Sequence, residues 1–232
     1  MDAVCLQRMA GLPRDEGYNS QAHSCMQEVG VRKIRIIEHI SLDGVIQAPG
    51  GKSEDGDYRY GGWSVAFADP VIGQTILAAH GQGFDLLLGR RTYDIWAGYW
   101  PTASGVIAES FNAATKYVAT HRPESLKWGR AEGLGADVVE GIREVKAKGG
   151  GDLILWGSST ITPLLLQHGL ADEVLLITYP VLLGMGKRFF SESAEARELA
   201  LVSTKAAASG VLLNTYRPVG SLRTGSFAEP NE

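Results

Sequence analysis

The sequence predicts a single-domain α/β fold, in which helices flank a mostly parallel central sheet that ends in an antiparallel hairpin. Short aliphatic or β-branched runs alternate with segments of helical spacing through most of the 232 residues, which is typical of parallel strands joined by crossover helices. Near the C-terminus, two alternating segments instead flank Ser209-Gly210 directly, and this turn signal predicts a hairpin at an edge of the sheet.

The strands are expected where short apolar runs lie between turn residues. Ile34, Ile36 and Ile37 mark a β-branched first strand at residues 33–40. The leucine-rich run at residues 84–88 is typical of a buried strand. The remaining strands are expected at residues 116–120, 152–156 and 173–179, with the hairpin strands at residues 199–207 and 211–217.

The helices are expected where apolar residues recur with a period of three or four. In residues 71–82 this spacing is carried by Ile72, Ile76 and Ala79, and Gly81 marks the end of the helix. The other helices are expected at residues 90–96, 104–113, 137–148 and 160–168.

One domain is expected at residues 31–218, because no repeat or internal linker interrupts this alternation. Residues 1–29 are predicted to be a disordered leader, and residues 219–232 a flexible tail. The leader lacks the basic start and apolar stretch of a signal peptide, so we expect a cytoplasmic protein. Met26 lies just before the first strand and is an alternative to Met1 as the start.

Composition argues against several function classes. The formal net charge of −4 is spread along the chain, whereas sequence-independent nucleic-acid binding depends on neutralising phosphates. No apolar run approaches the roughly 18 residues that span a bilayer. Cys5 and Cys25 are isolated in the polar leader, so we expect neither a disulfide framework nor thiol catalysis, and no metal site.

Three junctions between a predicted strand and the following segment can bind an anion. The first is Gly89-Arg90-Arg91-Thr92, where glycine permits close approach of a ligand to the backbone and arginine can bind a phosphate with two hydrogen bonds. The alternative is an ordinary helix start with surface arginines.

The second junction is Thr120-His121-Arg122-Pro123. A hydroxyl, an imidazole and a guanidinium together can bind a phosphomonoester, such as the 2′-phosphate that distinguishes NADPH from NADH. The alternative is a polar turn that ends at the proline.

The third junction is Gly157-Ser158-Ser159-Thr160, whose hydroxyls can cap a helix or bind a pyrophosphate. Capping does not exclude ligand binding. Together the three junctions predict a dinucleotide site, although no strand is followed by the Gly-x-Gly-x-x-Gly pattern of the Rossmann fold.

The same motifs carry a resemblance to a known family. In order along residues 31–218, the sequence resembles the dihydrofolate reductase-like superfamily, and most closely the reductase domain of the bifunctional riboflavin-biosynthesis deaminase-reductase. The motifs are Ser41-Leu42-Asp43-Gly44, Gly89-Arg90-Arg91-Thr92-Tyr93, Trp156-Gly157-Ser158-Ser159-Thr160 and the segment from Tyr179 to Lys187.

The resemblance implies an NADPH-binding reductase with the dihydrofolate reductase-like fold. By position, the first junction would contact the phosphates, the second the adenosine portion, and the third the pyrophosphate. Residues 41–62 would form a mobile loop that closes over nicotinamide and substrate.

Two departures narrow the resemblance. Folate reductases carry an acidic residue on the helix after this loop, whereas in residues 69–82 the only acid is Asp69, at the expected helix start. No His-x-Glu precedes a Cys-x-x-Cys, so the zinc signature of the deaminase is absent and a stand-alone reductase is expected.

Asp43 is the predicted catalytic residue, because a carboxylate there can orient substrate N–H groups or relay a proton. The equal alternative is a turn aspartate before a glycine. The other predicted substrate contacts, each with a structural alternative, are Ser41, Tyr58 and Trp63 in the loop and Lys187, which together with Arg188 can bind a substrate phosphate.

Other aromatic residues are expected to be structural. Trp96, Tyr99 and Trp100 are interpreted as core or subunit contacts, and His39 as a core or edge histidine because it alternates with apolar residues of the first strand.

The leading hypothesis is an NADPH-dependent reductase of the 5-amino-6-(5-phosphoribosylamino)uracil reductase type. The alternatives are a promiscuous reductase of folates or pterins and a catalytically silent nucleotide-binding module. By family analogy we expect a homodimer. We expect it to act on a small molecule, and from its charge and apolar pattern we expect it to bind neither nucleic acid nor membrane.

Overall fold

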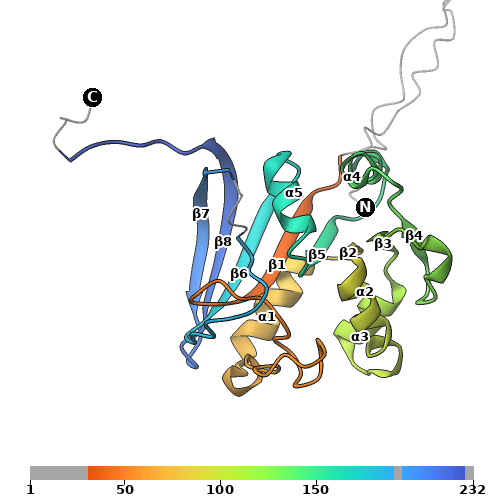
Figure 1. Ribbon diagram of the computed structural model, residues 1–232, viewed down its shortest axis with the longest axis horizontal. Helices are drawn as coiled ribbons and strands as arrows, with labels where there is room; N and C mark the ends of the chain where they lie inside the picture. Colours follow the sequence, from red (N-terminus) through yellow and green to blue (C-terminus); the bar gives the residue numbers. More distant parts are fainter. Residues whose placement is uncertain (1–30, 191–194, 228–232) are drawn as a thin grey trace, which may run out of the picture.

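A computed structural model describes residues 31–190 and 195–227 of the chain. Its eight-stranded sheet has the order β4-β3-β2-β5-β1-β6-β8-β7 (Figure 1). The strands are β1 Ile34–Ser41, β2 Asp85–Gly89, β3 Lys116–Ala119, β4 Ala131–Gly133, β5 Leu153–Trp156, β6 Glu173–Tyr179, β7 Arg197–Ala206 and β8 Leu212–Ser221.

The sheet is parallel from β4 to β6 and antiparallel at its other edge. β1 lies at the centre between β5 and β6, with Ile36 opposite Leu155 on one side and Val174 on the other. β8 runs antiparallel to both β6 and β7. Because the strands from β4 to β6 are parallel, their carboxyl ends all lie at one edge of the sheet, where ligands bind in open α/β folds.

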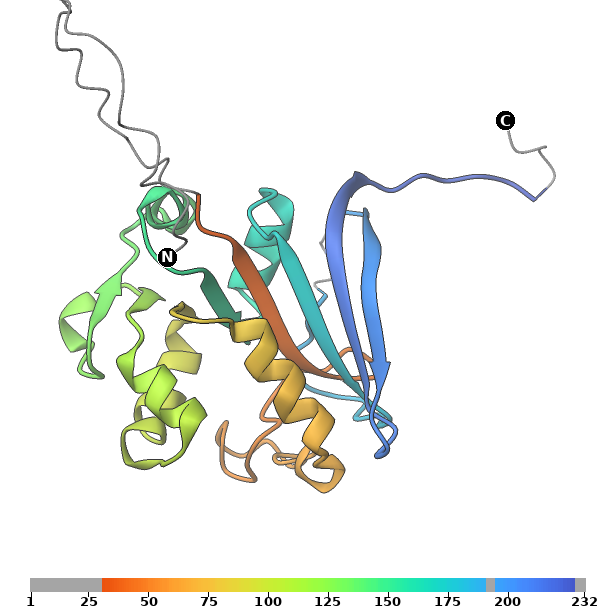
Figure 2. The ribbon, with the colours of Figure 1, turned by 180° about the vertical axis from the view of Figure 1, so that it is seen from behind.

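Helices cover both faces of the parallel part (Figures 1 and 2). One apolar core joins the sheet to α4 and α5, and the other joins it to α1, α2 and α3. The helices are α1 Pro70–His80, α2 Arg90–Ala97, α3 Val106–Ala113, α4 Val138–Ala147 and α5 Ile161–Gln167, with short 3₁₀ helices η1 Val65–Phe67, η2 Trp100–Thr102 and η3 Pro123–Ser125.

These elements confirm the predicted fold class, and the differences lie at element ends. β4 was not predicted, because three residues that include Glu132 and Gly133 carry no strand signal. β8 continues to Ser221, beyond the predicted strand end at residue 217 and into the predicted tail, because Gly220 and Ser221 pair with β7. The predicted leader, with Cys5, Cys25 and Met26, lies outside the described residues.

Two further findings concern the described part of the chain. No helix there has the length and apolar composition needed to cross a bilayer. Its His, Cys, Asp and Glu side chains form no group of three or more that could hold a metal ion.

Candidate cofactor and substrate cleft

A cleft of about 420 Å³ opens where β1, β2 and β5 end. Its wall contains Gly89 to Thr92 from the first predicted junction and Gly157 to Thr160 from the third. A second cavity of about 330 Å³ is lined by Thr120, His121 and Arg122 of the second junction. Arg90 and Thr160 line both cavities, so the two are neighbours. The structure therefore brings all three predicted junctions together.

Glycine is required where the ends of β2 and β5 approach each other. A Cβ on Gly89 would lie 2.6 Å from the hydroxyl oxygen of Ser158, and Gly157 adopts a φ of +64°. Ser158 itself has a φ of +78°, which is uncommon for a residue with a side chain and stores strain. Its hydroxyl oxygen accepts the backbone N–H of Ile161 at 3.1 Å and therefore also caps α5.

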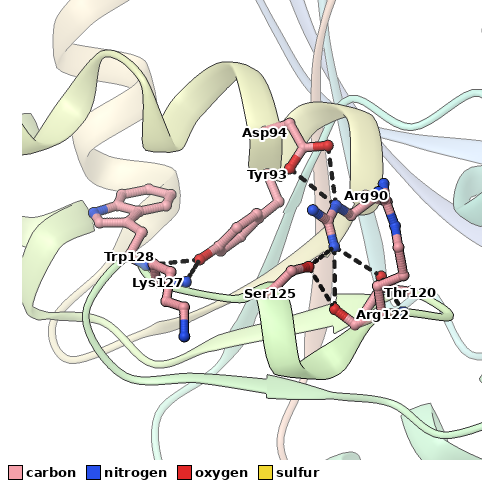
Figure 3. A network of polar contacts seen from close by, with 8 residues as sticks. All are labelled: Arg90, Tyr93, Asp94, Thr120, Arg122, Ser125, Lys127 and Trp128. Atoms are coloured by element: carbon pink, nitrogen blue, oxygen red, sulfur yellow. Dashed lines mark hydrogen bonds and ion pairs between the residues drawn. The ribbon is translucent and has the colours of Figure 1, made fainter.

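Arg90 is held by protein groups (Figure 3). Its Nε donates to both carboxylate oxygens of Asp94, at 2.9 and 3.0 Å. Its terminal nitrogen donates to the hydroxyls of Ser125 and Thr120, at 2.6 and 3.1 Å, and to the carbonyl of Arg122 at 3.2 Å. Arg90 thus joins α2 to the segment after β3, and this geometry supports a structural function more than the predicted phosphate contact.

Arg122 differs from Arg90 because its guanidinium has no hydrogen-bond or ion-pair partner in the described residues. Only its backbone takes part in the network of Figure 3: its N–H donates to the hydroxyl of Thr120 at 3.1 Å, and its carbonyl accepts from Ser125. The side chain is exposed and lines the second cavity. It is therefore available to a ligand.

The long loop is connected to two predicted ligand-binding residues through Asp55. This carboxylate accepts from Arg91 Nε, Lys187 Nζ and Gln47 Nε2, at 2.7, 2.7 and 2.8 Å respectively. Burial alone would raise the pKa of Asp55, but the hydrogen bonds from Lys187 and Arg91 hold it below its usual value. All four side chains line the cleft, so the loop lies across its polar wall.

Asp43 lies outside the cleft wall, as does Ser41. The carboxylate of Asp43 accepts from the hydroxyl of Ser41 at 2.6 Å and from the backbone N–H groups of Leu183 and Gly184, at 3.1 and 2.7 Å. Burial opposes ionisation, yet these hydrogen bonds lower the pKa of Asp43 to about 2. The contacts support the turn alternative, and a catalytic function for Asp43 stays a prediction.

Tyr58 and Trp63 also lie outside the cleft wall, where they anchor the loop. The Tyr58 hydroxyl donates to the carbonyl of Met185 at 2.7 Å, and Trp63 Nε1 donates to the carbonyl of Gln47 at 2.8 Å. The Trp63 ring packs edge-on against Tyr179 at 5.2 Å. These contacts favour the structural alternative for both residues.

Aromatic residues that were interpreted as structural contribute much of the cleft wall. Trp96 stacks on Phe111 at 4.8 Å, and Trp100 meets the same ring edge-on at 4.9 Å. Trp100 Nε1 is buried and has no hydrogen-bond partner among the residues that the structure describes. The apolar part of the wall consists of Ile76, Ile95, Trp96, Trp100, Ile107, Phe111 and Trp156. It suits a flat ring.

β1 contributes two ionisable residues to the cleft, Glu38 and His39, which the sequence analysis did not assign to it. His39 Nδ1 pairs with the hydroxyl of Tyr179 at 2.8 Å, and burial lowers the pKa of His39 to about 4. Glu38 is 3% exposed, and burial raises its pKa well above the usual value. The sequence signal for Glu38 was that it is the one acid in this isoleucine-rich strand.

The helix after the loop carries no acid into the cleft. The carboxylate of Asp69 accepts the backbone N–H of Val71 at 2.9 Å and caps α1, while Ile76 is the residue of α1 that lines the cleft. As the sequence predicts, α1 therefore lacks the acidic residue that folate reductases carry on the helix after the loop.

Comparisons with known proteins identify the family and the fold of the chain. A family model described as the RibD C-terminal domain matches residues 32–213. The uncharacterized protein YyaP of Bacillus subtilis (strain 168) is 26% identical over 190 residues, which cover 80% of this chain and 94% of that protein.

Two solved structures share the fold at low sequence identity. A protein from Shewanella sp. PV-4 that is assigned by name to riboflavin biosynthesis has a TM-score of 0.64 at 21% identity, with 81% of this chain and 99% of that chain covered. Dihydrofolate reductase from Enterococcus faecalis has a TM-score of 0.54 at 15% identity, with 80% and 96% covered. The chain belongs to the RibD C-terminal domain family and has the dihydrofolate reductase-like fold.

Proposed function

We propose that this protein is an NADPH-dependent reductase that transfers a hydride to a heterocyclic substrate. The observation that carries the proposal is the pair of neighbouring cavities at the strand ends, which meet at Arg90 and Thr160. A dinucleotide needs such a site, with room for a flat ring at each end and polar groups between them.

The residues of the cavities fit the parts of NADPH. Gly89 permits close approach of a ligand to the backbone, and the Ser158 to Thr160 hydroxyls offer donors to the pyrophosphate. Thr120, His121 and Arg122 would hold the adenosine portion, and the free guanidinium of Arg122 would bind the 2′-phosphate. When bound, the nicotinamide supplies the hydride, and the chain orients the reactants and excludes water.

The aromatic wall supports a flat heterocycle as substrate. Trp96, Trp100 and Trp156 offer aromatic surface against which a flat ring can pack. A pyrimidine of the 5-amino-6-(5-phosphoribosylamino)uracil type is our first candidate. Its phosphate would compete with Asp55 for Lys187. A pterin is the second candidate, although no acid on α1 faces the cleft.

The experiment that tests this function is a titration with NADPH and NADH that follows tryptophan fluorescence, because three tryptophans line the cleft. NADPH is expected to quench the fluorescence, and candidate pyrimidines and pterins are then tested for oxidation of bound NADPH. The proposal fails if neither dinucleotide binds below roughly millimolar concentration. Tight NADPH binding without oxidation by any candidate would favour a silent nucleotide-binding module.

Replacing Arg122 with alanine is expected to weaken NADPH binding about 10- to 100-fold and to leave NADH binding almost unchanged. A hydrogen bond to a charged group contributes about 1.5–3 kcal/mol, and NADH lacks the phosphate that would receive it. The measurement is the Kd of each dinucleotide. The exposed Arg143 on α4 provides the control variant Arg143→Ala. Equal weakening of both dinucleotides would remove Arg122 from the 2′-phosphate site.

We also propose that the protein is a homodimer in the cytoplasm. The outer hairpin leaves Leu201, Val202 and Val219 at least half exposed, and β7 is an edge strand that no helix covers (Figure 1). Sedimentation equilibrium is expected to give twice the chain mass. A monomer at micromolar concentration would contradict the dimer and leave the reductase proposal intact.

A further inference from the structure

His39 lies on the face of β1 that carries the aromatic wall of the cleft. Paired residues of neighbouring strands point to the same face of a sheet, and His39 is opposite Ile177 of β6, which belongs to the apolar core of α1, α2 and α3. Phe111 belongs to this core as well, and Trp96 and Trp100 pack against it. The side chain of His39 therefore points to the side where the aromatic wall lies, and it lines the cleft.

The imidazole of His39 lies between two aromatic residues. Its centroid is 5.5 Å from the ring of Trp156 on β5 and 5.6 Å from the ring of Tyr179 on β6. Both neighbours are buried, and Trp156 is itself part of the cleft wall. The strands on both sides of β1 therefore hold the imidazole in place at the cleft.

The two nitrogens of His39 have different surroundings. Nδ1 lies 2.8 Å from the hydroxyl of Tyr179. Nε2 has no hydrogen-bond partner among residues 31–190 and 195–227, and unlike Trp100 Nε1 it is not sealed from solvent. The side chain as a whole is partly exposed. Nε2 is therefore the polar atom of His39 that a ligand in the cleft can reach.

The hydrogen bonds behind His39 determine which nitrogen carries the proton. The hydroxyl of Ser64 donates to the carbonyl of Pro49 at 2.8 Å, and it also forms a hydrogen bond with the hydroxyl of Tyr179. Because a hydroxyl has one proton, Ser64 accepts from Tyr179, and Tyr179 in turn accepts from His39. We therefore assign the proton of the imidazole to Nδ1, which leaves a lone pair on Nε2.

The lone pair on Nε2 persists near neutral pH. Burial lowers the pKa of His39 to about 4, so the imidazole stays neutral. The aromatic and aliphatic side chains of the wall offer Nε2 no donor of their own. A ligand that brings an N–H group to this position satisfies the acceptor, whereas a ligand without one leaves it unpaired.

We propose that His39 Nε2 accepts a hydrogen bond from a ring N–H of the heterocyclic substrate, and thereby selects rings that carry this donor, as uracil does. This inference rests on the proposed reductase function. The aromatic wall contributes contact area to any flat ring, whereas a fixed acceptor distinguishes a ring with an N–H from a ring without one. His39 binds and orients the ring, and it takes no part in making or breaking bonds.

Uracil and 1,3-dimethyluracil are the informative probes, because methylation removes the ring N–H groups and keeps the ring and its carbonyls. With the NADPH-saturated wild type, the Kd of uracil is expected to be about 10-fold lower than that of 1,3-dimethyluracil. His39→Phe keeps a flat side chain but has no acceptor, and it is expected to bind both probes equally. A steric effect of the methyl groups would instead persist in this variant.

Two controls accompany these titrations. His168→Phe, at an exposed histidine after α5, is the matched variant and is expected to keep the preference for uracil. The Kd of NADPH is expected to be the same in His39→Phe as in the wild type. Weaker NADPH binding in His39→Phe would assign Nε2 to the carboxamide of the nicotinamide and overturn the proposal.

A second measurement needs no variant. ¹⁵N NMR of the histidine-labelled wild type distinguishes the two neutral tautomers, and His39 is assigned by its contacts with Trp156 and Tyr179. The Nδ1–H tautomer is expected, and uracil but not 1,3-dimethyluracil is expected to shift the Nε2 signal of the NADPH-saturated protein. An Nε2–H tautomer would overturn the proposal, because Nε2 would then be a donor.

The remaining outcomes separate this inference from the reductase function. Equal affinity of the wild type for the two probes, or a preference for uracil that His39→Phe retains, would overturn the role of His39. Absence of uracil binding to protein that binds NADPH would do the same. Failure of the reductase function itself would instead appear as absence of NADPH binding to the wild type.

Discussion

Replacing Gly141 with alanine is expected to destabilise the fold by about 2–3 kcal/mol, although alanine is the better helix former. Gly141 lies in the first half of α4, and a Cβ there would lie 2.0 Å from the carbonyl oxygen of Leu134. Because that oxygen belongs to the backbone between β4 and α4, no side-chain rotation relieves the overlap. Overpacking of this kind costs more than the roughly 1 kcal/mol that helix propensity returns.

Gly73 in α1 provides the matched control. It is also a helical glycine, but a Cβ there would meet no atom within 4 Å. Gly73→Ala is therefore expected to stabilise the protein by about 0.5–1 kcal/mol. Chemical denaturation of the two variants measures both effects, and a Gly141→Ala protein as stable as the wild type would show that α4 moves away from Leu134 at little cost.

The fold class was predictable because it depends on local patterns. The alternation of apolar strands with amphipathic helices is written into consecutive residues, and the turn at Ser209 and Gly210 marks the hairpin. β4 has no such pattern: its three residues form a strand because Lys116 to Val118 offer an open edge to pair with. That edge exists only after the rest of the sheet has formed.

The junctions were predictable as a group, but the function of each side chain was not. Parallel strands bring their carboxyl ends to one edge, so Gly89, Thr120 and Gly157 were expected to lie near each other. Arg90 has the residue type of a phosphate ligand, yet its partners Thr120 and Ser125 are 30 and 35 positions away. Nothing near Arg90 in the sequence indicates that they would hold it.

The same limit explains the interpretation of Asp43 and Glu38. Leu183 and Gly184, which bind the Asp43 carboxylate, are 140 and 141 positions away. Glu38 lines the cleft together with the loop from Ile46 to Gly50, and no periodic signal predicts where that loop lies. The surroundings of Asp43 and Glu38 therefore depend on residues far away in the sequence, which local patterns do not predict.

Acid is expected to destabilise the protein through His80, between pH 6.5 and about 4. His80 is 3% exposed, and its Nε2 accepts the indole N–H of Trp156 at 3.0 Å. Protonation of Nε2 would break this bond, and burial lowers the pKa of His80 from 6.5 to about 4. The unfolded chain therefore binds a proton at higher pH than the folded chain does, and stability falls as pH decreases through this window.

The expected loss is about 3 kcal/mol, since each unit of difference in pKa corresponds to about 1.4 kcal/mol. His80→Gln keeps an acceptor for Trp156 but cannot titrate, so its free energy of unfolding should change less than that of the wild type between pH 7 and pH 4. His168→Gln, at an exposed histidine after α5, is the control and should follow the wild type.

The comparison between variants also separates the effect of His80 from the effects of the buried ionisable residues of the cleft wall. The pKa of His39 is lowered in the same way, so His39 adds to the loss of protein stability in acid. The pKa of Glu38 is raised, so its protonation stabilises the folded protein as pH falls. Both contributions are common to the wild type and His80→Gln and cancel in their difference. If the difference in free energy of unfolding between the wild type and His80→Gln does not depend on pH, then burial does not hold His80 neutral and the prediction is wrong.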